Sequence, residues 1–164
     1  MLIFASNHAW FQEINNENLP VEVKVMAVVM DSAAMSPTVI LYDESGKIML
    51  PIWIGTSEAY AIQLELSGEK PPRPLTNDLL KTVMDKLGAK LDKTVVTMVQ
   101  DQTYYAKLYL QSPDGEIEID ARPSDAIALA MRSKAPIFVN KDVLTKHGIS
   151  TETKKNTNEK TRKT

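Results

Sequence analysis

The stretch that decides the fold is Val21–Asp31, with the sequence VEVKVMAVVMD. Its first residues alternate between apolar and polar and the rest form an apolar run, so it predicts a strand inside a sheet. The part Val25–Asp31 (VMAVVMD) has a counterpart in Val95–Asp101 (VVTMVQD), 70 residues further along the chain. We therefore expect two related strands, one in each half of a duplicated domain.

The two halves resemble each other beyond these strands. Gly46 matches Gly115 at an offset of 69, and Ser57–Ile62 matches Ser124–Leu129 at an offset of 67. Each half is predicted to run strand, strand, strand, helix: residues 21–31, 38–42, 47–54 and 57–66, then residues 93–100, 103–111, 116–121 and 125–133. Chance similarity between β-rich segments is the alternative to a duplication.

The remaining elements complete the predicted fold. A helix over 77–87 is inserted between the halves, a short strand covers 136–139, and a helical turn covers 142–146. Thr56 and Thr76 are expected to cap the helices that follow them, and Ile117 and Ile119 to face inward. The inserted helix is expected to bury one stripe, made of Leu79, Leu80, Val83, Met84 and Leu87. The fold class is thus α+β: duplicated β-β-β-α halves with an inserted helix, and a mixed or antiparallel sheet packed by helices.

Composition narrows the class of protein. The chain has 164 residues, with no Cys and two His. This length favours one domain, and the lack of Cys excludes a disulfide framework, a thiolate zinc site and a cysteine nucleophile. No apolar run is long enough to span a membrane, and the first residues do not have the pattern of a signal peptide. We expect a cytoplasmic protein with no membrane partner.

Charge divides the chain into a body and a tail. Residues 151–164 carry five basic and two acidic residues, so residues 1–150 hold 14 basic and 19 acidic ones. The predicted organisation is a leader over 1–20 that is at most partly ordered, a folded domain over 21–149, and a disordered basic tail over 150–164. An acidic body is a poor match for a dedicated duplex-DNA binder, because phosphate neutralisation dominates that affinity.

Two clusters of polar residues lie where helices are predicted to begin. One is Asp120-Ala-Arg122-Pro-Ser124-Asp125, and the other is Arg73-Pro-Leu-Thr76-Asn77-Asp78. Glu58 occupies the position of Asp125 in the other half. Helix N-termini bind anions, Arg recognises phosphate, and carboxylates hold Mg²⁺ for phosphodiester hydrolysis. The alternative is structural: the acids stabilise helix first turns, and Arg122 pairs with Asp120 or Asp125.

These blocks resemble the bifunctional nuclease family. The resemblance rests on Leu50–Gly55 (LPIWIG) with Glu58, on Arg73–Leu80 (RPLTNDLL) and on Asp120–Ile127 (DARPSDAI), and it covers about residues 21–149. It implies an α+β fold, a homodimer, and the DNase and RNase activity attributed to plant members. The family block usually reads R-P-x-T-H-D, and here Asn77 stands in place of the His.

Carried over by residue, the resemblance implies a site. Asp78, Asp120, Arg122, Asp125 and Arg73 are the candidate catalytic residues. Candidate substrate contacts are Arg73, Arg122, Ser124, Thr76 and Asn77. Asp120, Asp125 and Glu58 are candidate ligands for Mg²⁺ or Mn²⁺, and no organic cofactor is expected. Trp53 is expected in the core or in a dimer interface rather than as a surface on which bases stack.

Two functions remain open. The leading hypothesis is a metal-assisted nuclease of low sequence specificity that acts on single-stranded DNA or RNA. The alternative is a non-enzymatic dimeric module that binds an anionic ligand or a protein partner, and it gains if Asp120 and Asp125 point apart. A homodimer or higher homo-oligomer is expected because sheet edges need protection, either by edge pairing or by packing of the Leu50–Ile54 strand across a two-fold axis.

Overall fold

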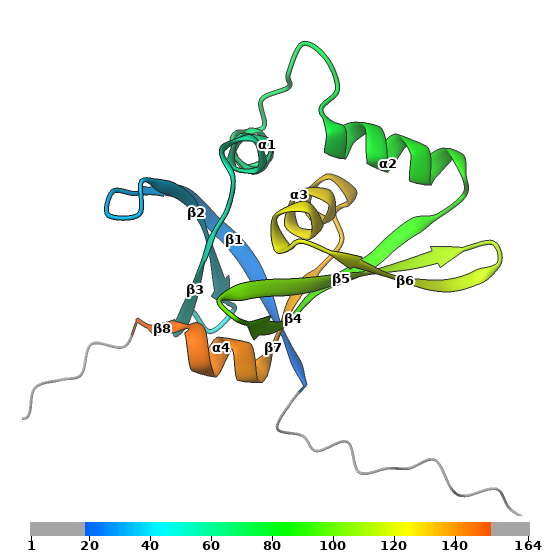
Figure 1. The fold of residues 1–164 in the computed structure, drawn as a ribbon. Coiled ribbons are helices and arrows are strands. Elements are labelled where there is room, and N and C mark those ends of the chain that lie inside the picture. Colours follow the sequence, from blue (N-terminus) through cyan, green and yellow to red (C-terminus); the bar gives the residue numbers. More distant parts are fainter. Residues whose placement is uncertain (1–18, 152–164) are drawn as a thin grey trace, which may run out of the picture.

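Two three-stranded meanders form most of the domain in the computed structural model, which describes residues 19–151 (Figure 1). The first consists of β1 (Pro20–Asp31), β2 (Ser36–Asp43) and β3 (Ile48–Trp53), and α1 (Thr56–Ser67) follows it. The second consists of β4 (Lys90–Gln100), β5 (Thr103–Ser112) and β6 (Gly115–Ala121), followed by α3 (Pro123–Ser133). Between them lies α2 (Thr76–Lys86). The predicted β-β-β-α order of both halves, with an inserted helix, is confirmed.

A short strand joins the two meanders into one sheet. β7 (Ile137–Asn140) pairs antiparallel with β1 and parallel with β4. The sheet has eight strands in the order β6-β5-β4-β7-β1-β2-β3-β8, where β8 (Ile149–Ser150) pairs with the start of β3. The sheet is therefore mixed, and β6 and β8 form its two edges.

The helices lie on both faces of this sheet. α1, α2 and α3 cover one face, and α4 (Lys141–His147) lies on the other (Figure 1). α3 is the central helix, because all five residues from Ala126 to Ala130 are at most 1% exposed. α3 packs against α1, α2, β4 and β5, and α1 covers β1 and β2. The shared core includes fully buried side chains of both meanders and of α1, among them Val39, Leu41, Leu50, Ile62 and Ala106.

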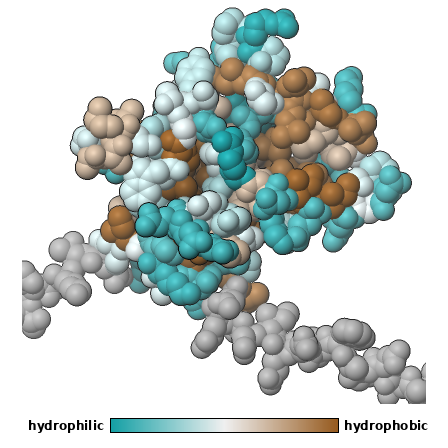
Figure 2. Space-filling view, in the orientation of Figure 1, coloured by the Kyte–Doolittle hydropathy of each residue, from teal (hydrophilic) through white to brown (hydrophobic). Residues whose placement is uncertain are grey.

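Most of the predicted stripe on α2 is not buried, so that prediction is wrong. Met84 is 8% exposed, but Leu79, Leu80, Val83 and Leu87 are 59%, 41%, 45% and 71% exposed. The reason is that α2 lies at the rim of the helical layer and packs against α3 along one side only. On the adjacent edge strand β6, Ile117 and Ile119 point toward the helices as predicted but remain 42% and 41% exposed. Together these residues form an apolar surface, the α2–β6 surface, seen as brown patches in Figure 2.

The predicted helix caps are also wrong by one residue. Thr56 and Thr76 are the first residues of α1 and α2, whereas Gly55 and Leu75 occupy the cap positions. In α2 the carboxylate of Asp78, the third helical residue, accepts the backbone N–H of Leu75 at 2.7 Å, which is the reverse half of a capping box.

The Leu50–Ile54 strand does not offer its apolar face to a second copy. Leu50, Ile52 and Ile54 are 0%, 2% and 8% exposed within the domain's own core. Packing of that apolar face against a second copy is therefore excluded, while association through the opposite face of the strand, which carries Trp53, stays a prediction.

Two further observations concern the ends and the helices of the domain. The predictions for the leader and for the tail fall mostly on residues 1–18 and 152–164, which lie outside the described residues. Within residues 19–151, none of the helices is both long and apolar enough to cross a membrane.

Candidate functional site

Arg122 brings the first turns of α1 and α3 together. It occupies the N-cap position of α3, and its guanidinium donates two hydrogen bonds to Asp125, Nε to Oδ2 at 2.7 Å and Nη2 to Oδ1 at 3.0 Å. The same Nη2 lies 2.9 Å from Oε1 of Glu58, in the first turn of α1. Hydrogen bonding to Asp125, and then the charge of Glu58, raise the pKa of Arg122, so the guanidinium stays charged. Although it bridges two helices, the Arg122 side chain is 66% exposed.

A glycine makes room for this arrangement. The carboxylate of Glu58 folds back over Gly55, where a Cβ atom would overlap it. The backbone of Gly55 has φ −74°, which any residue adopts, so the requirement at this position is steric. A side chain at position 55 would therefore require the Glu58 carboxylate to move from this position.

Asp78 belongs to a different ion pair. Its Oδ1 accepts Nε of Arg132 at 2.6 Å, and the Arg132 side chain is only 4% exposed. Arg132 also donates to the carbonyl of Ala61 at 3.2 Å, so this pair connects α1, α2 and α3. Burial raises the pKa of the Asp78 carboxyl, but the hydrogen bonds from the Leu75 N–H and from Arg132 outweigh it, and its pKa lies below the ordinary value. Both oxygens of Asp78 are thus engaged in holding the helices together.

Asp120 lies away from both of these clusters. It is on β6 directly across from Lys107 of β5, on the face of the sheet that points away from α3. Asp125 and Glu58 are on the helix side and both bind Arg122. The predicted ligands Asp120, Asp125 and Glu58 therefore do not converge, and no group of three His, Cys, Asp or Glu side chains within residues 19–151 has the geometry to hold a metal. As arranged here, these three carboxylates do not fit Mg²⁺ or Mn²⁺.

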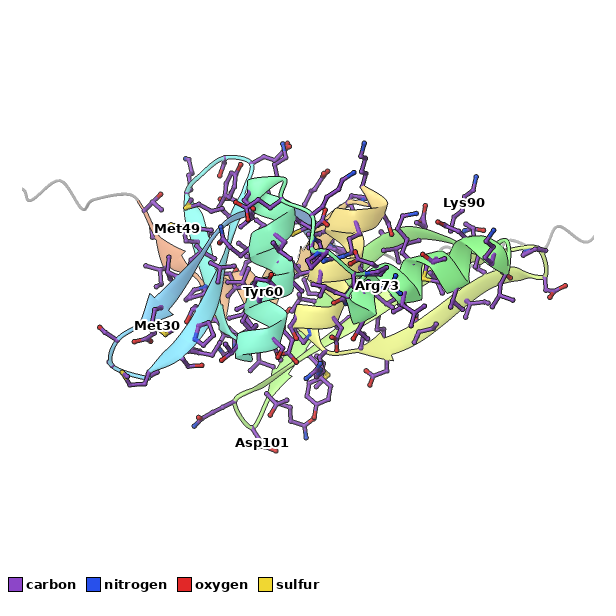
Figure 3. All side chains as sticks on the ribbon, turned by 90° about the horizontal axis from the view of Figure 1, so that it is seen from above. Met30, Met49, Tyr60, Arg73, Lys90 and Asp101 are labelled. Atoms are coloured by element: carbon purple, nitrogen blue, oxygen red, sulfur yellow. The ribbon has the colours of Figure 1, made fainter. Side chains whose placement is uncertain are left out.

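The other predicted substrate contacts are divided between two places. Ser124 is 6% exposed at the start of α3, next to Arg122. Thr76 and Asn77 are the first two residues of α2, and Arg73 lies on the exposed connector that leads into that helix (Figure 3). Among the described residues, Arg73 has no ion-pair partner, so its charge faces solvent.

A cavity of about 430 Å³ opens beside Arg122. Its walls come from four segments of the chain: the start of β2, the end of β3, the start of β5 and the start of α3. The polar and aromatic residues of its lining include Trp53, Gln102, Tyr104, Arg122 and Ser124. A second cavity, also of about 430 Å³, shares Trp53, Gln102 and Tyr104 and adds Val99, Asp101 and His147. Ligand sites in proteins commonly have volumes in this range, about 300–1,000 Å³.

One of the two places predicted for Trp53 is wrong. This residue is 53% exposed, so a place in the core is wrong; a dimer interface stays a prediction. A signal was present in the sequence: Leu50, Ile52 and Ile54 alternate in the strand, and Trp53 falls on the opposite face. Tyr104 and Gln102 gave no comparable signal, because the approach of the β4–β5 turn to β3 arises from the curvature of the whole sheet (Figure 1).

Comparison with known proteins places these residues within one family. The bifunctional nuclease domain matches residues 39–152, which include the Arg122 cluster, Asp78 and both aromatic residues of the cavity. The chain belongs to the bifunctional nuclease domain family. It is 41% identical over 128 residues to an uncharacterized protein of Mycobacterium tuberculosis, covering 78% of this chain and 76% of that protein.

The plant relatives in this comparison are named as nucleases. The chain is 32% identical over 112 residues to bifunctional nuclease 1 of Arabidopsis thaliana, which is 66% of this chain and 34% of the plant protein. It is 29% identical over 122 residues to bifunctional nuclease 1 of Oryza sativa subsp. japonica, which is 73% of this chain and 37% of that protein. The match thus spans about a third of each plant protein.

Proposed function

We propose that this chain is a nuclease of low sequence specificity that binds single-stranded DNA or RNA in the cavity beside Arg122. The observation that carries the proposal is the exposed, permanently charged guanidinium of Arg122 at the rim of a cavity of about 430 Å³ that also contains Trp53 and Tyr104. Guanidinium groups bind phosphate through paired hydrogen bonds, and aromatic faces bind bases. Family membership and the names of the plant relatives support the same substrate class.

Arg122 changes partners when a phosphate binds. Glu58 accepts only from Nη2, whereas Asp125 accepts from both Nε and Nη2, so Glu58 is the partner that a phosphate oxygen displaces. The displaced carboxylate of Glu58 then lies beside the bound phosphate. There it accepts the proton of the water that attacks phosphorus, while the bond from phosphorus to the leaving oxygen breaks and that oxygen takes a proton from solvent. Arg122 stabilises the charge that develops on the phosphate oxygens.

A divalent metal stays a prediction of the family resemblance. Because Asp120, Asp125 and Glu58 do not converge, no step of this mechanism is assigned to Mg²⁺ or Mn²⁺. Dependence of cleavage on either ion is therefore an outcome to be measured.

A second function is favoured by the same ion pairs. Asp125 and Glu58 are both neutralised by Arg122, and Asp120 is on the other face of the sheet. This arrangement supports the alternative of a non-enzymatic module, in which Arg122 holds an anionic ligand and no bond is cleaved.

Hydrolysis of labelled single-stranded DNA and RNA separates the two functions. We would compare the unaltered protein with Arg122→Ala and Glu58→Gln, each in Mg²⁺, in Mn²⁺ and in a chelator. The matched control is Lys107→Ala, which removes an exposed cation that pairs with Glu118 on the opposite face of the sheet. A nuclease loses at least tenfold in cleavage with Arg122→Ala and Glu58→Gln, and keeps its activity with Lys107→Ala. Cleavage that is equal in all four proteins indicates a contaminant and contradicts the proposal; binding without cleavage establishes the module instead.

A further inference from the structure

The two cavities beside Arg122 meet at a pair of aromatic side chains. Trp53 comes from the end of β3 and Tyr104 from the start of β5, and both residues line both cavities. Arg122 lines only the first cavity, and His147 lines only the second. The cavities together therefore form one cleft, with a cation at one end and aromatic rings along its middle.

The orientation of the Trp53 ring is fixed from one side. Its Nε1–H donates to Oδ2 of Asp31 at 2.9 Å, and the other oxygen of Asp31 accepts the backbone N–H groups of Ala33 and Ala34 at 2.9 and 3.1 Å. The hydrogen bond from Trp53, followed by those from Ala34 and Ala33, lowers the pKa of Asp31, so this carboxylate stays ionised at neutral pH. The polar edge of the indole is thus satisfied within the protein, whereas the side chain as a whole is 53% exposed.

The β5 side of the cleft carries groups that can contact the edge of a flat ligand. The ring of Tyr104 is half-buried against His147, with ring centroids 5.9 Å apart in an edge-to-face arrangement. Burial raises the pKa of Tyr104, so its hydroxyl stays protonated and remains a hydrogen-bond donor. The neighbouring turn residues Asp101 and Gln102 both have positive φ, 47° and 61°, although neither is a glycine. Positive φ at both residues is the geometry of a two-residue type I′ hairpin turn, which joins β4 directly to β5 and brings Gln102 to the cleft.

We propose that Trp53 is the stacking surface for one unpaired nucleobase, whose phosphate is held by Arg122. The proposal rests on the nucleic-acid binding proposed above and specifies its ligand as one nucleotide unit within a single strand. Because the indole N–H is held by Asp31, the ring offers its face and no hydrogen-bonding edge. Stacking on a face accepts every base, so the cleft binds without sequence preference.

The same geometry excludes a duplex. In a double helix both faces of each base are covered by its neighbours, so a base must leave the stack before it can contact an aromatic side chain. We therefore expect binding to a single strand to exceed binding to the same sequence as a duplex.

The experiment measures the anisotropy of a fluorescein-labelled ten-nucleotide oligo-dT on the full chain. The test variants are Trp53→Ala and Trp53→Phe. The matched control is Tyr60→Ala, since Tyr60 is 54% exposed on α1 and lines neither cavity (Figure 3). We expect Trp53→Ala to raise Kd by about 5- to 150-fold, Trp53→Phe to stay within about 3-fold of the unaltered protein, and Tyr60→Ala to have no effect. Retention of the folded circular-dichroism spectrum by Trp53→Phe shows that the comparison is made between folded proteins.

Two further probes separate the base from the phosphate. An abasic oligonucleotide of the same length keeps the phosphates, so it should bind the unaltered protein and Trp53→Ala equally. In a Trp10→Phe protein, Trp53 is the remaining tryptophan, and oligo-dT should quench its fluorescence. Two results overturn the proposal. One is equal affinity of Trp53→Ala and the unaltered protein for oligo-dT. The other is quenching of Trp53 fluorescence by the abasic strand but not by oligo-dT.

The outcomes also separate this inference from the proposed nuclease activity. Cleavage that is lost in Arg122→Ala and unchanged in Trp53→Ala supports the nuclease and overturns the stacking surface. Tight binding that depends on Trp53, without any cleavage, supports the stacking surface and contradicts the nuclease. If adenosine monophosphate binds as tightly as oligo-dT, the ligand is a free nucleotide, and the proposal of a single strand as the ligand is overturned.

Discussion

Two acidic residues in similar sequence surroundings have different partners in the structure. Asp78 follows Arg-Pro-Leu-Thr-Asn and Asp125 follows Arg-Pro-Ser, and both lie in the first turn of a helix. Asp125 binds an exposed arginine from its own helix start, whereas Asp78 binds the buried Arg132 of α3. The exposure of the arginine decides the role: Arg122 can exchange its partner for a ligand, and Arg132 cannot.

Substitution of Asp78 should therefore act on stability. We expect Asp78→Ala to lower the free energy of unfolding by about 2–3 kcal/mol, because the buried guanidinium of Arg132 loses a charged hydrogen-bond partner. Urea unfolding measures this loss. The control is Asp85→Ala, which removes only an exposed i,i+4 pair with Lys81 and should cost less than about 0.5 kcal/mol. Loss of cleavage in an Asp78→Ala protein of unchanged stability would instead place Asp78 in the catalytic site.

This contribution depends on pH in a defined direction. The pKa of Asp78 is lower in the folded protein than in the unfolded chain, so the pair stabilises the fold above the ordinary carboxyl pKa of about 4. The stabilisation disappears as the pH falls through the folded-state pKa. The difference in unfolding free energy between the unaltered protein and Asp78→Ala should accordingly be constant near neutral pH and shrink below about pH 4.

At the scale of elements, the turn between β4 and β5 combines strain with a position in the cleft. Gln102 has φ 61° and lines both cavities, whereas Met35, with φ 50°, lies in the β1–β2 turn and lines neither. A left-handed conformation is unfavourable for both side chains and free of strain for glycine.

These two turns offer a matched pair of substitutions. We expect Gln102→Gly and Met35→Gly each to raise the free energy of unfolding by about 0.5–1 kcal/mol, because each relieves a left-handed side chain. Only Gln102→Gly should also weaken the binding of oligo-dT. Thermal or urea unfolding together with anisotropy checks both effects, and an equal change in binding for the two variants would show that the turn has no part in the cleft.

For the whole molecule, charge restricts how a nucleic acid can bind. Residues 1–150 hold 14 basic and 19 acidic residues, so the body as a whole repels a polyanion. Binding must then come from a local site. The cleft provides one, since Arg122 stands beside uncharged aromatic walls where stacking does not depend on net charge.

The α2–β6 surface predicts self-association. It combines the exposed leucines and valine of α2 with the isoleucines of the edge strand β6, and contiguous exposed apolar patches mark interaction surfaces. We expect sedimentation velocity at micromolar concentration to give about twice the monomer mass of 18.3 kDa. Val83→Glu should convert the protein to a monomer, while Tyr60→Glu, outside this surface, should leave the mass unchanged. A mass of 18.3 kDa for the unaltered protein would contradict the prediction.

The sequence predicts a contact of the site when its two residues are close in the chain, and it does not predict contacts between residues far apart in the chain. The Arg122–Asp125 pair spans three residues, and the sequence alone named it as a possibility. The contact of Glu58 with Arg122 and that of Asp78 with Arg132 span 64 and 54 residues, and no local pattern encodes either. The predicted metal ligands illustrate the same limit: Asp120 and Asp125 are close in sequence, but a strand end and a helix start direct them to opposite sides of the sheet.

The sequence by itself determined the order of the elements, the two β-β-β-α halves and the family, because alternation, turn residues and short motifs are local properties of a chain. It did not determine which apolar stripe would be covered or which polar groups would meet. Only the tertiary structure decided that Met84 alone of its stripe is buried, that Asp78 holds a buried arginine, and that Trp53, Tyr104 and Arg122 share one cleft. The physical reason is that these outcomes depend on how the sheet curves and where each helix lies on it, and those are properties of the assembled layers.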